Sequence, residues 1–105
     1  MSVKCLCINN KNRPKEVLPQ NWINEGTQYT INYVYYHVNQ GIQGVTLDEV
    51  ETKSLEYTSY RLDRFAFTKE GIDQLIELMK DCTEIGKTDI MKLIEENNLE
   101  LIETN

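Results

Sequence analysis

The sequence contains little of what enzymes and membrane proteins commonly require. His37 is its one histidine, so histidine-based catalysis would rest on that residue, and we identify no catalytic residues. The five glycines are scattered, which excludes a glycine-rich phosphate loop. No apolar run approaches the roughly 18 residues that cross a bilayer, and the apolar start of the chain is too short for a secretory signal. We therefore expect a cytoplasmic protein without a membrane segment.

Cysteine is also sparse, and its three residues include no Cys-x-x-Cys pair. An odd number of cysteines without a secretory signal indicates reduced thiols. Cys5 and Cys7 point to one face of a predicted strand, and with His37 and Cys82 they could supply four zinc ligands. Structural zinc sites usually use Cys-x-x-Cys pairs, however, and free cysteine is among the most buried residue types. We expect all three thiols in the core, and no metal or cofactor.

Charge is unevenly distributed along a chain of ordinary globular composition. The 105 residues are 40% hydrophobic and 27% charged, which predicts one domain over residues 1–105. Residues 1–47 carry four bases and two acids, whereas residues 48–105 carry seven bases and fifteen acids. The acidic second half would repel phosphate backbones, so a nucleic-acid partner is disfavoured. A protein partner remains compatible with this charge.

Apolar patterns predict a strand-rich first half. Residues 3–8 read as a buried strand, and residues 45–50 as the returning strand of a hairpin. In residues 27–38, apolar and polar residues alternate with the period of a half-buried strand. This alternation changes phase near Val34, which predicts a bulge or burial of both faces. Residues 57–67 predict a short helical turn that leads into a strand.

The second half has a helical pattern. Thr68 is a predicted N-cap, followed by an apolar stripe at helical spacing (Ile72, Leu75, Ile76 and Met79). Thr88 is a second candidate N-cap, and residues 99–102 would either extend that helix or form a final strand. The stripe could pack on the strands or on a second copy of the chain. A homodimer through the C-terminal helices is therefore one expectation.

Two segments of the first half carry a family resemblance. Residues 7–16 read Cys-Ile-Asn-Asn-Lys-Asn-Arg-Pro-Lys-Glu, and residues 22–31 read Trp-Ile-Asn-Glu-Gly-Thr-Gln-Tyr-Thr-Ile. Together with Arg64-Phe65, they resemble a group of short, uncharacterised proteins of Bacteroidetes and their phages. The resemblance covers residues 3–67 and implies a small SH3-like antiparallel β-barrel. The expected fold is thus α+β, with a barrel over residues 1–67 and two short helices in an acidic part over residues 68–105.

Aromatic residues are the most suggestive candidates for a binding surface. Such clusters line peptide grooves and stacking platforms, although aromatics also dominate small cores. The candidate partner-binding residues are Trp22, Tyr35, Tyr36, Tyr57 and Tyr60. Three cations that alternate in one loop could hold an anion, and these are Lys11, Arg13 and Lys15.

No catalytic pattern emerges, so we expect a non-enzymatic protein-protein interaction module. A phage or mobile-element accessory role is compatible with the resemblance. Two alternatives follow from other residues. The first is a nucleic-acid-binding small barrel that uses the tyrosines and the basic loop. The second is a small enzyme or ligand-binding protein that uses His37.

Overall fold

The computed structural model describes residues 2–37, 42–82 and 89–102. Within these ranges six strands form one sheet, in the order β4-β3-β2-β1-β5-β6. The strands are β1 (Val3–Cys7), β2 (Gln28–His37), β3 (Ile42–Leu47), β4 (Tyr60–Arg61), β5 (Phe65–Phe67) and β6 (Glu100–Leu101). Neighbouring strands are antiparallel except β5 and β6, which are parallel. The expected α+β class is confirmed.

The change of phase predicted in the second strand is a real irregularity of β2. Its pairing with β3 shifts register between Ile31 and Tyr33. Ile31 is fully buried before the shift and Val34 is 1% exposed after it, so the inward set passes from odd to even positions. Tyr35 is consequently 42% exposed on the outer face. The turn predicted at residues 39–41 lies outside the described residues.

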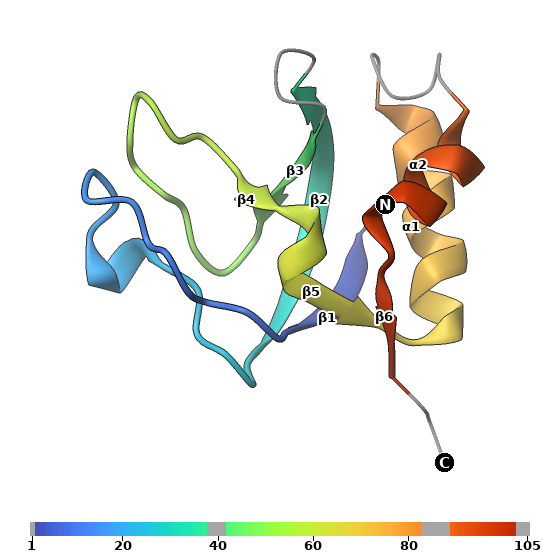
Figure 1. Cartoon of the computed structure of the whole chain (residues 1–105), viewed down its shortest axis with the longest axis horizontal. Coiled ribbons are helices and arrows are strands. Elements are labelled where there is room, and N and C mark those ends of the chain that lie inside the picture. Colours follow the sequence, from blue (N-terminus) through green and yellow to red (C-terminus); the bar gives the residue numbers. More distant parts are fainter. Residues whose placement is uncertain (1, 38–41, 83–88, 103–105) are drawn as a thin grey trace.

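Two helices, α1 (Lys69–Asp81) and α2 (Ile90–Asn97), lie together beside the sheet (Figure 1). The predicted cap of α1 is confirmed, since the Gly71 N–H donates to Thr68 Oγ1 at 2.9 Å. Asp89 caps α2 by accepting from the Lys92 N–H, and Thr88 lies outside the described residues. Asn98 ends α2 in a left-handed conformation, with φ of 50°. Among the described residues, neither helix has the length and apolar character that crossing a bilayer requires.

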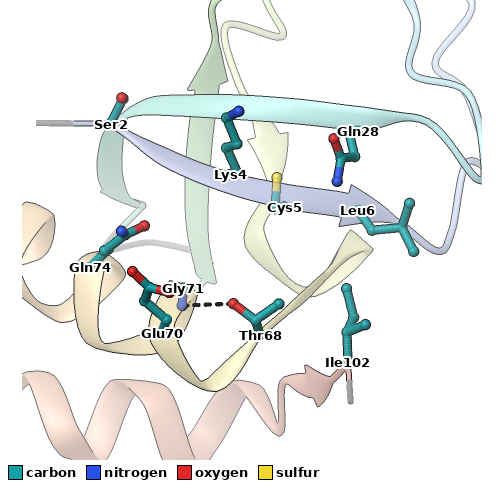
Figure 2. Close-up of a pocket in the computed structure, with 10 residues that line it drawn as sticks. All are labelled: Ser2, Lys4, Cys5, Leu6, Gln28, Thr68, Glu70, Gly71, Gln74 and Ile102. Atoms are coloured by element: carbon teal, nitrogen blue, oxygen red, sulfur yellow. Dashed lines mark hydrogen bonds between the residues drawn. The ribbon is translucent and has the colours of Figure 1, made fainter. Parts of the chain in front are cut away.

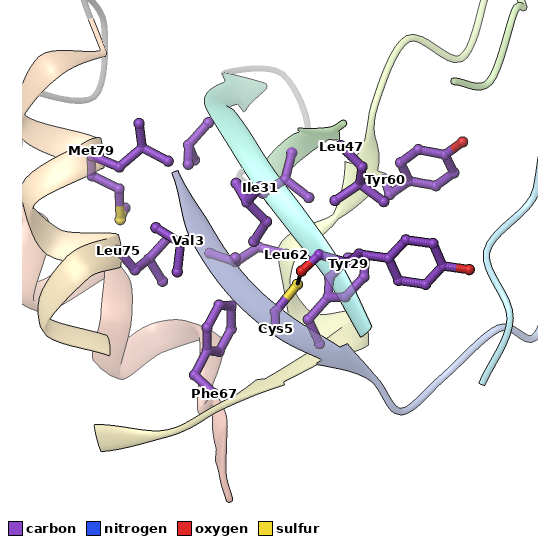
Figure 3. Packing of buried hydrophobic residues seen from close by; sticks show 14 of the residues in the cluster. Val3, Cys5, Tyr29, Ile31, Leu47, Tyr60, Leu62, Phe67, Leu75 and Met79 are labelled. Atoms are coloured by element: carbon purple, nitrogen blue, oxygen red, sulfur yellow. Dashed lines mark hydrogen bonds between the residues drawn. The ribbon is translucent and has the colours of Figure 1, made fainter. Parts of the chain in front are cut away.

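The apolar stripe of α1 packs on the sheet of the same chain. Leu75 and Met79 have no exposed surface, and Figure 3 shows both pointing from α1 toward Val3 and Phe67. A Cβ at Gly71 would lie 3.2 Å from Thr68 Oγ1, so glycine leaves room for the hydroxyl that caps the helix. The residues expected to form a homodimer therefore already have a partner inside the chain. The dimer itself stays a prediction.

The end of the chain rejoins the sheet. Residues 100–101 form β6 beside β5, and the Ile102 N–H donates to the Phe67 carbonyl at 2.7 Å. Of the two alternatives for residues 99–102, the strand is correct. The C-terminal part is thus not purely helical, because it contributes an edge strand to the sheet of residues 3–67.

The sheet is open, and the expected closure into an SH3-like barrel is not confirmed. Its two edges are β4 and β6, and no hydrogen-bonded pair among the described residues joins them. The predicted turn over residues 60–65 is present as η2, a 3-10 helix (Leu62–Arg64) that follows β4 and leads into β5. Because β5 then pairs with β1 and carries β6 on its other side, it is not available to pair with β4.

Two long loops form the end of the molecule opposite the helices (Figure 1). The first loop, residues 8–27, joins β1 to β2 and contains a 3-10 helix, η1 (Pro19–Asn21). The second loop, residues 48–59, joins β3 to β4. Val17 and Ile23 from the first loop and Thr52 from the second are buried, so each loop is anchored from within.

Candidate binding site

A cavity of about 500 Å³ lies between the two loops and the edge of the sheet. We call it the Trp22 pocket. Its walls come from the first loop, from the start of β3, and from the segment that runs from the second loop into η2. The lining residues are Asn12, Pro14, Trp22, Ile42, Gly44, Glu56, Tyr57, Thr58, Ser59, Tyr60, Arg61 and Arg64. Tyr57 is 39% exposed beside it.

The aromatic wall of the pocket is held at both ends by hydrogen bonds. The rings of Trp22 and Tyr60 lie 5.6 Å apart at a tilt of 50°. The Trp22 indole N–H donates to the Asn10 carbonyl at 2.6 Å, and the Tyr60 hydroxyl donates to the Asn21 carbonyl at 2.7 Å. Burial raises the pKa of Tyr60, so this hydroxyl stays a donor. Because both polar groups are engaged, the rings are positioned before any ligand arrives.

Arg64 covers the aromatic wall with a charge. Its guanidinium carbon lies 5.0 Å from the centre of the Trp22 ring, a cation–π distance. Nη1 donates to the carbonyl oxygens of Lys11 at 2.7 Å and Asn9 at 3.3 Å, and thereby ties η2 to the first loop. Burial lowers the pKa of Arg64, although an arginine remains charged. Its Nε is buried and has no hydrogen-bond partner.

Arg61 lines the same pocket but is already paired. Its Nε donates to Asp63 Oδ1 at 3.2 Å and its Nη2 donates to Asp63 Oδ2 at 2.9 Å. This is the two-pronged arrangement in which a guanidinium edge holds a carboxylate. No acceptor among the described residues occupies the equivalent edge of Arg64.

Three of the five aromatic candidates meet in this pocket, and two do not. Trp22 is half-buried and Tyr57 is exposed, so both present surface to a ligand. Tyr60 also lines the pocket, but it is only 2% exposed and its ring packs against Trp22 from the core side. Tyr35 lies on the outer face against the ring of Tyr33, with centroids 4.7 Å apart. Tyr36 is half-buried against the main core.

The three cations of the basic loop have different surroundings, and their role in holding an anion stays a prediction. The Arg13 guanidinium donates to the Val17 carbonyl, so it braces the loop that contains it. Lys11 and Lys15 are exposed, and the residues between these cations, Asn12 and Pro14, line the pocket. Arg64 is not among the candidate site residues predicted from the sequence, although Arg64-Phe65 is part of the family resemblance. Nothing in the sequence pattern places it over Trp22.

The thiols are buried, as expected. Burial raises the pKa of Cys5 to about 12, and it also raises the pKa values of Cys7 and Cys82. Within the described ranges no three histidine, cysteine, aspartate or glutamate residues are grouped as metal ligands would be. His37 is the last residue of β2, and its side chain lies outside the described part of the structure.

Two further cavities lie elsewhere on the described part of the molecule. One, of about 480 Å³, lies between the outer face of β1 and the first turn of α1 (Figure 2). Glu70 and Gln74 lie toward one end of it and Gln28, Leu6 and Ile102 toward the other, with Lys4 between them (Figure 2). The other, of about 380 Å³, lies beneath the second loop. Neither is lined by a Trp or Arg side chain.

The Trp22 pocket is therefore the best candidate site, because it combines exposed aromatic surface with an arginine edge that no described residue occupies. Comparisons with protein-family models, with curated proteins and with solved structures find no match for this chain.

Proposed function

We propose that this protein is a non-enzymatic protein-protein interaction module and that the Trp22 pocket receives part of its partner. The observation that carries the proposal is the Arg64 guanidinium stacked over a half-buried tryptophan beside the exposed Tyr57. Arginine, tryptophan and tyrosine are the residue types that most often dominate the energy of protein interfaces. Here they surround one concave surface, as a peptide anchor requires.

The SH3-like character of the first part belongs to the same proposal. Strands β1 to β4 follow one another as antiparallel neighbours, and η2 then returns the chain to pair β5 with the far edge of β1. Such an order curls a short sheet toward its own start. Small barrels of this kind bind extended peptides in aromatic-lined grooves, which is the mode we propose here.

The test is capture of a partner from host lysate by the immobilised protein, followed by binding of the purified partner. Tyr57→Ala and Trp22→Ala should each weaken binding by at least about tenfold, as expected of an interface anchor. Tyr35→Ala is the matched control, since Tyr35 is similarly exposed but does not line the pocket. Circular dichroism would verify that Trp22→Ala is folded.

The opposite pattern would reject the proposal. A partner that binds the two pocket variants as tightly as the unmodified protein, and binds Tyr35→Ala weakly, would place the interface on the outer face of β2. A purified protein that turns over a substrate without any partner, and loses that activity in His37→Ala, would support the enzyme alternative instead.

A further inference from the structure

The surroundings of the Trp22 pocket are cationic on an acidic chain. Residues 9–15 and 56–64, which include most of its lining, carry the cations Lys11, Arg13, Lys15, Arg61 and Arg64 and the anions Glu56 and Asp63, a net charge of +3. The whole chain carries −6, so all other residues together carry −9. A ligand that approaches this pocket therefore meets a charge opposite to that of the rest of the protein.

Arg61 and Arg64 both line the pocket, but only Arg61 has a carboxylate on the Nε and Nη2 edge of its guanidinium group. In Arg61 the Nε and Nη2 edge holds the carboxylate of Asp63, with bonds of 3.2 and 2.9 Å. In Arg64 the donor to Asn9 and Lys11 is Nη1, so the Nε and Nη2 edge has no acceptor among the described residues. Nε is shielded from water and has no partner, and the Arg64 side chain lines the pocket. A shielded donor without an acceptor costs free energy, and an incoming carboxylate would remove that cost.

We infer, building on the proposed function, that the partner enters the Trp22 pocket as a peptide segment in which an acidic side chain adjoins an apolar one. The carboxylate binds the Nε and Nη2 edge of Arg64, as the Asp63 carboxylate binds Arg61. The apolar side chain packs against Trp22 and Tyr57.

The chemistry of the wall favours a peptide over a nucleic acid. A polyanion would extend beyond the pocket over residues that carry −9, and this repulsion grows with its length. A short peptide needs only one carboxylate at Arg64, and its apolar neighbour gains from the apolar surface of Pro14, Trp22 and Ile42. The pocket, at about 500 Å³, has room for one acidic and one apolar side chain of the peptide.

The test uses Trp22 as its own probe, because it is the one tryptophan in the chain. Tryptophan emission is followed while acetylated and amidated hexapeptides are added. Each probe has a central Leu-Glu or Leu-Asp pair, and its matched control has Leu-Gln or Leu-Asn at the same positions. We expect saturable binding of acidic peptides, at least about tenfold tighter than of their amides, as one charge-assisted pair provides. This preference should shrink as salt increases.

Variants separate recognition from folding. Arg64→Lys keeps the charge but loses the planar edge, so the acid-over-amide preference should fall by about tenfold. Arg61→Lys is the matched control and should keep the preference, because Arg61 is occupied by Asp63. Since Arg64 also ties η2 to the first loop, the preference shown by the unmodified protein is the decisive measurement should Arg64→Lys fail to fold.

The outcomes distinguish this inference from the proposed function. Equal binding of acidic and amide peptides would overturn the inference and leave a peptide-binding pocket. A partner whose capture is insensitive to Trp22 and Tyr57 would overturn the proposed function itself. Tighter binding of a single-stranded oligonucleotide than of any peptide would also overturn it. A concentration-dependent dimer in light scattering that Leu55→Asp abolishes would mean that the Leu55-Glu56 segment of a second copy is the occupant, and would overturn a separate partner.

Discussion

Leu75 at the helical end and Leu55 at the loop end differ completely in exposure, although they have the same side chain. Leu75, on α1, has no exposed surface and lies among Val3, Phe67 and Met79 in the core (Figure 3). Leu55, in the second loop, is fully exposed. Its loop is nevertheless ordered by hydrogen bonds, since Ser54 Oγ accepts from the N–H groups of Glu56 and Tyr57 at 3.2 Å.

The same contrast holds for polar groups. At the helical end, Asn97 donates to the buried Gln43 side chain and to the Leu93 carbonyl, so that α2 is fixed over β3. At the loop end, Arg64 Nε is buried with no acceptor. Buried donors are almost always satisfied in native proteins, and exceptions tend to mark functional sites. Among the described residues, the polar groups of the helical end are thus paired across elements, whereas the loop end holds one buried donor without an acceptor.

Truncation of these two leucines should give the largest difference in the free energy of unfolding. Leu75→Ala should lower the free energy of unfolding by about 2–5 kcal/mol, because it leaves a cavity in a closely packed core. Leu55→Ala should change it by less than about 0.5 kcal/mol, because no packed contact is lost. Urea unfolding followed by circular dichroism measures both. Comparable losses in the two variants would show that Leu55 is buried in solution and that the contrast between the ends is wrong.

The helical end was largely predictable from sequence. Of the predicted stripe, Leu75 and Met79 are buried while Ile72 and Ile76 are half-buried, and Thr68 is the N-cap of α1. The buried Leu78 was not predicted. These signals are local, because capping and helical periodicity depend on residues within a few positions. In β2 the change of phase near Val34 correctly predicted an irregularity. Its position between Ile31 and Tyr33 is set by their pairing with Leu47 and Thr46 of β3.

The loop end was only partly predictable. Trp22 and Tyr57 were identified as aromatic candidates, but Tyr60 could not be recognised as buried, because its partner Asn21 lies in a distant loop. The position of Arg64 over Trp22 likewise depends on η2 and the first loop coming together. The third strand was expected at residues 45–50 and is observed at Ile42–Leu47, since its register is set by β2. Long-range contacts of this kind leave no periodic pattern.

The dependence of the free energy of unfolding on pH provides a second test of the closed core. Cys5 has a pKa of about 12 in the folded protein against a usual value of 9.0, and the pKa of Tyr60 is also raised by burial. Between pH 9 and 12 the unfolded chain therefore loses protons that the folded chain keeps, and the free energy of unfolding falls as pH rises. Below pH 9 this contribution is fully present. Urea unfolding at pH 8, 9 and 10 should show the decline, and Cys5→Ala should reduce its slope.

Thiol labelling provides the control for that experiment. In the native protein at pH 8, iodoacetamide should react slowly with all three cysteines, because each is buried and has a raised pKa. In urea all three should react rapidly. Rapid labelling of the native protein, or a stability that does not change between pH 8 and 10, would contradict a closed core around β1.

The smallest expected effect lies where the two ends meet. Glu49 follows β3, and its carboxylate accepts from the Thr30 N–H at 2.8 Å and from the Thr30 hydroxyl at 2.7 Å. The Asp48 N–H donates to the Thr30 carbonyl at 3.0 Å, so these two residues continue the pairing of β3 with β2 and direct the second loop. Glu49→Ala should lower the free energy of unfolding by about 0.5–1 kcal/mol, since the bonds are charge-assisted but exposed. It should also weaken peptide binding, because the second loop carries Tyr57.

Glu51→Ala is the matched control for Glu49→Ala. Glu51 is an exposed carboxylate in the same loop, and its removal should leave stability within about 0.5 kcal/mol of the unmodified protein. If the two variants were equally stable but only Glu49→Ala bound peptide weakly, Glu49 would position the loop without stabilising the sheet. If neither property differed between them, the second loop would be held by other contacts, of which the Thr52 hydroxyl bond to the Tyr57 carbonyl is the first to test. These two variants thus test whether the order of the second loop depends on its hydrogen bonds to Thr30 in the sheet.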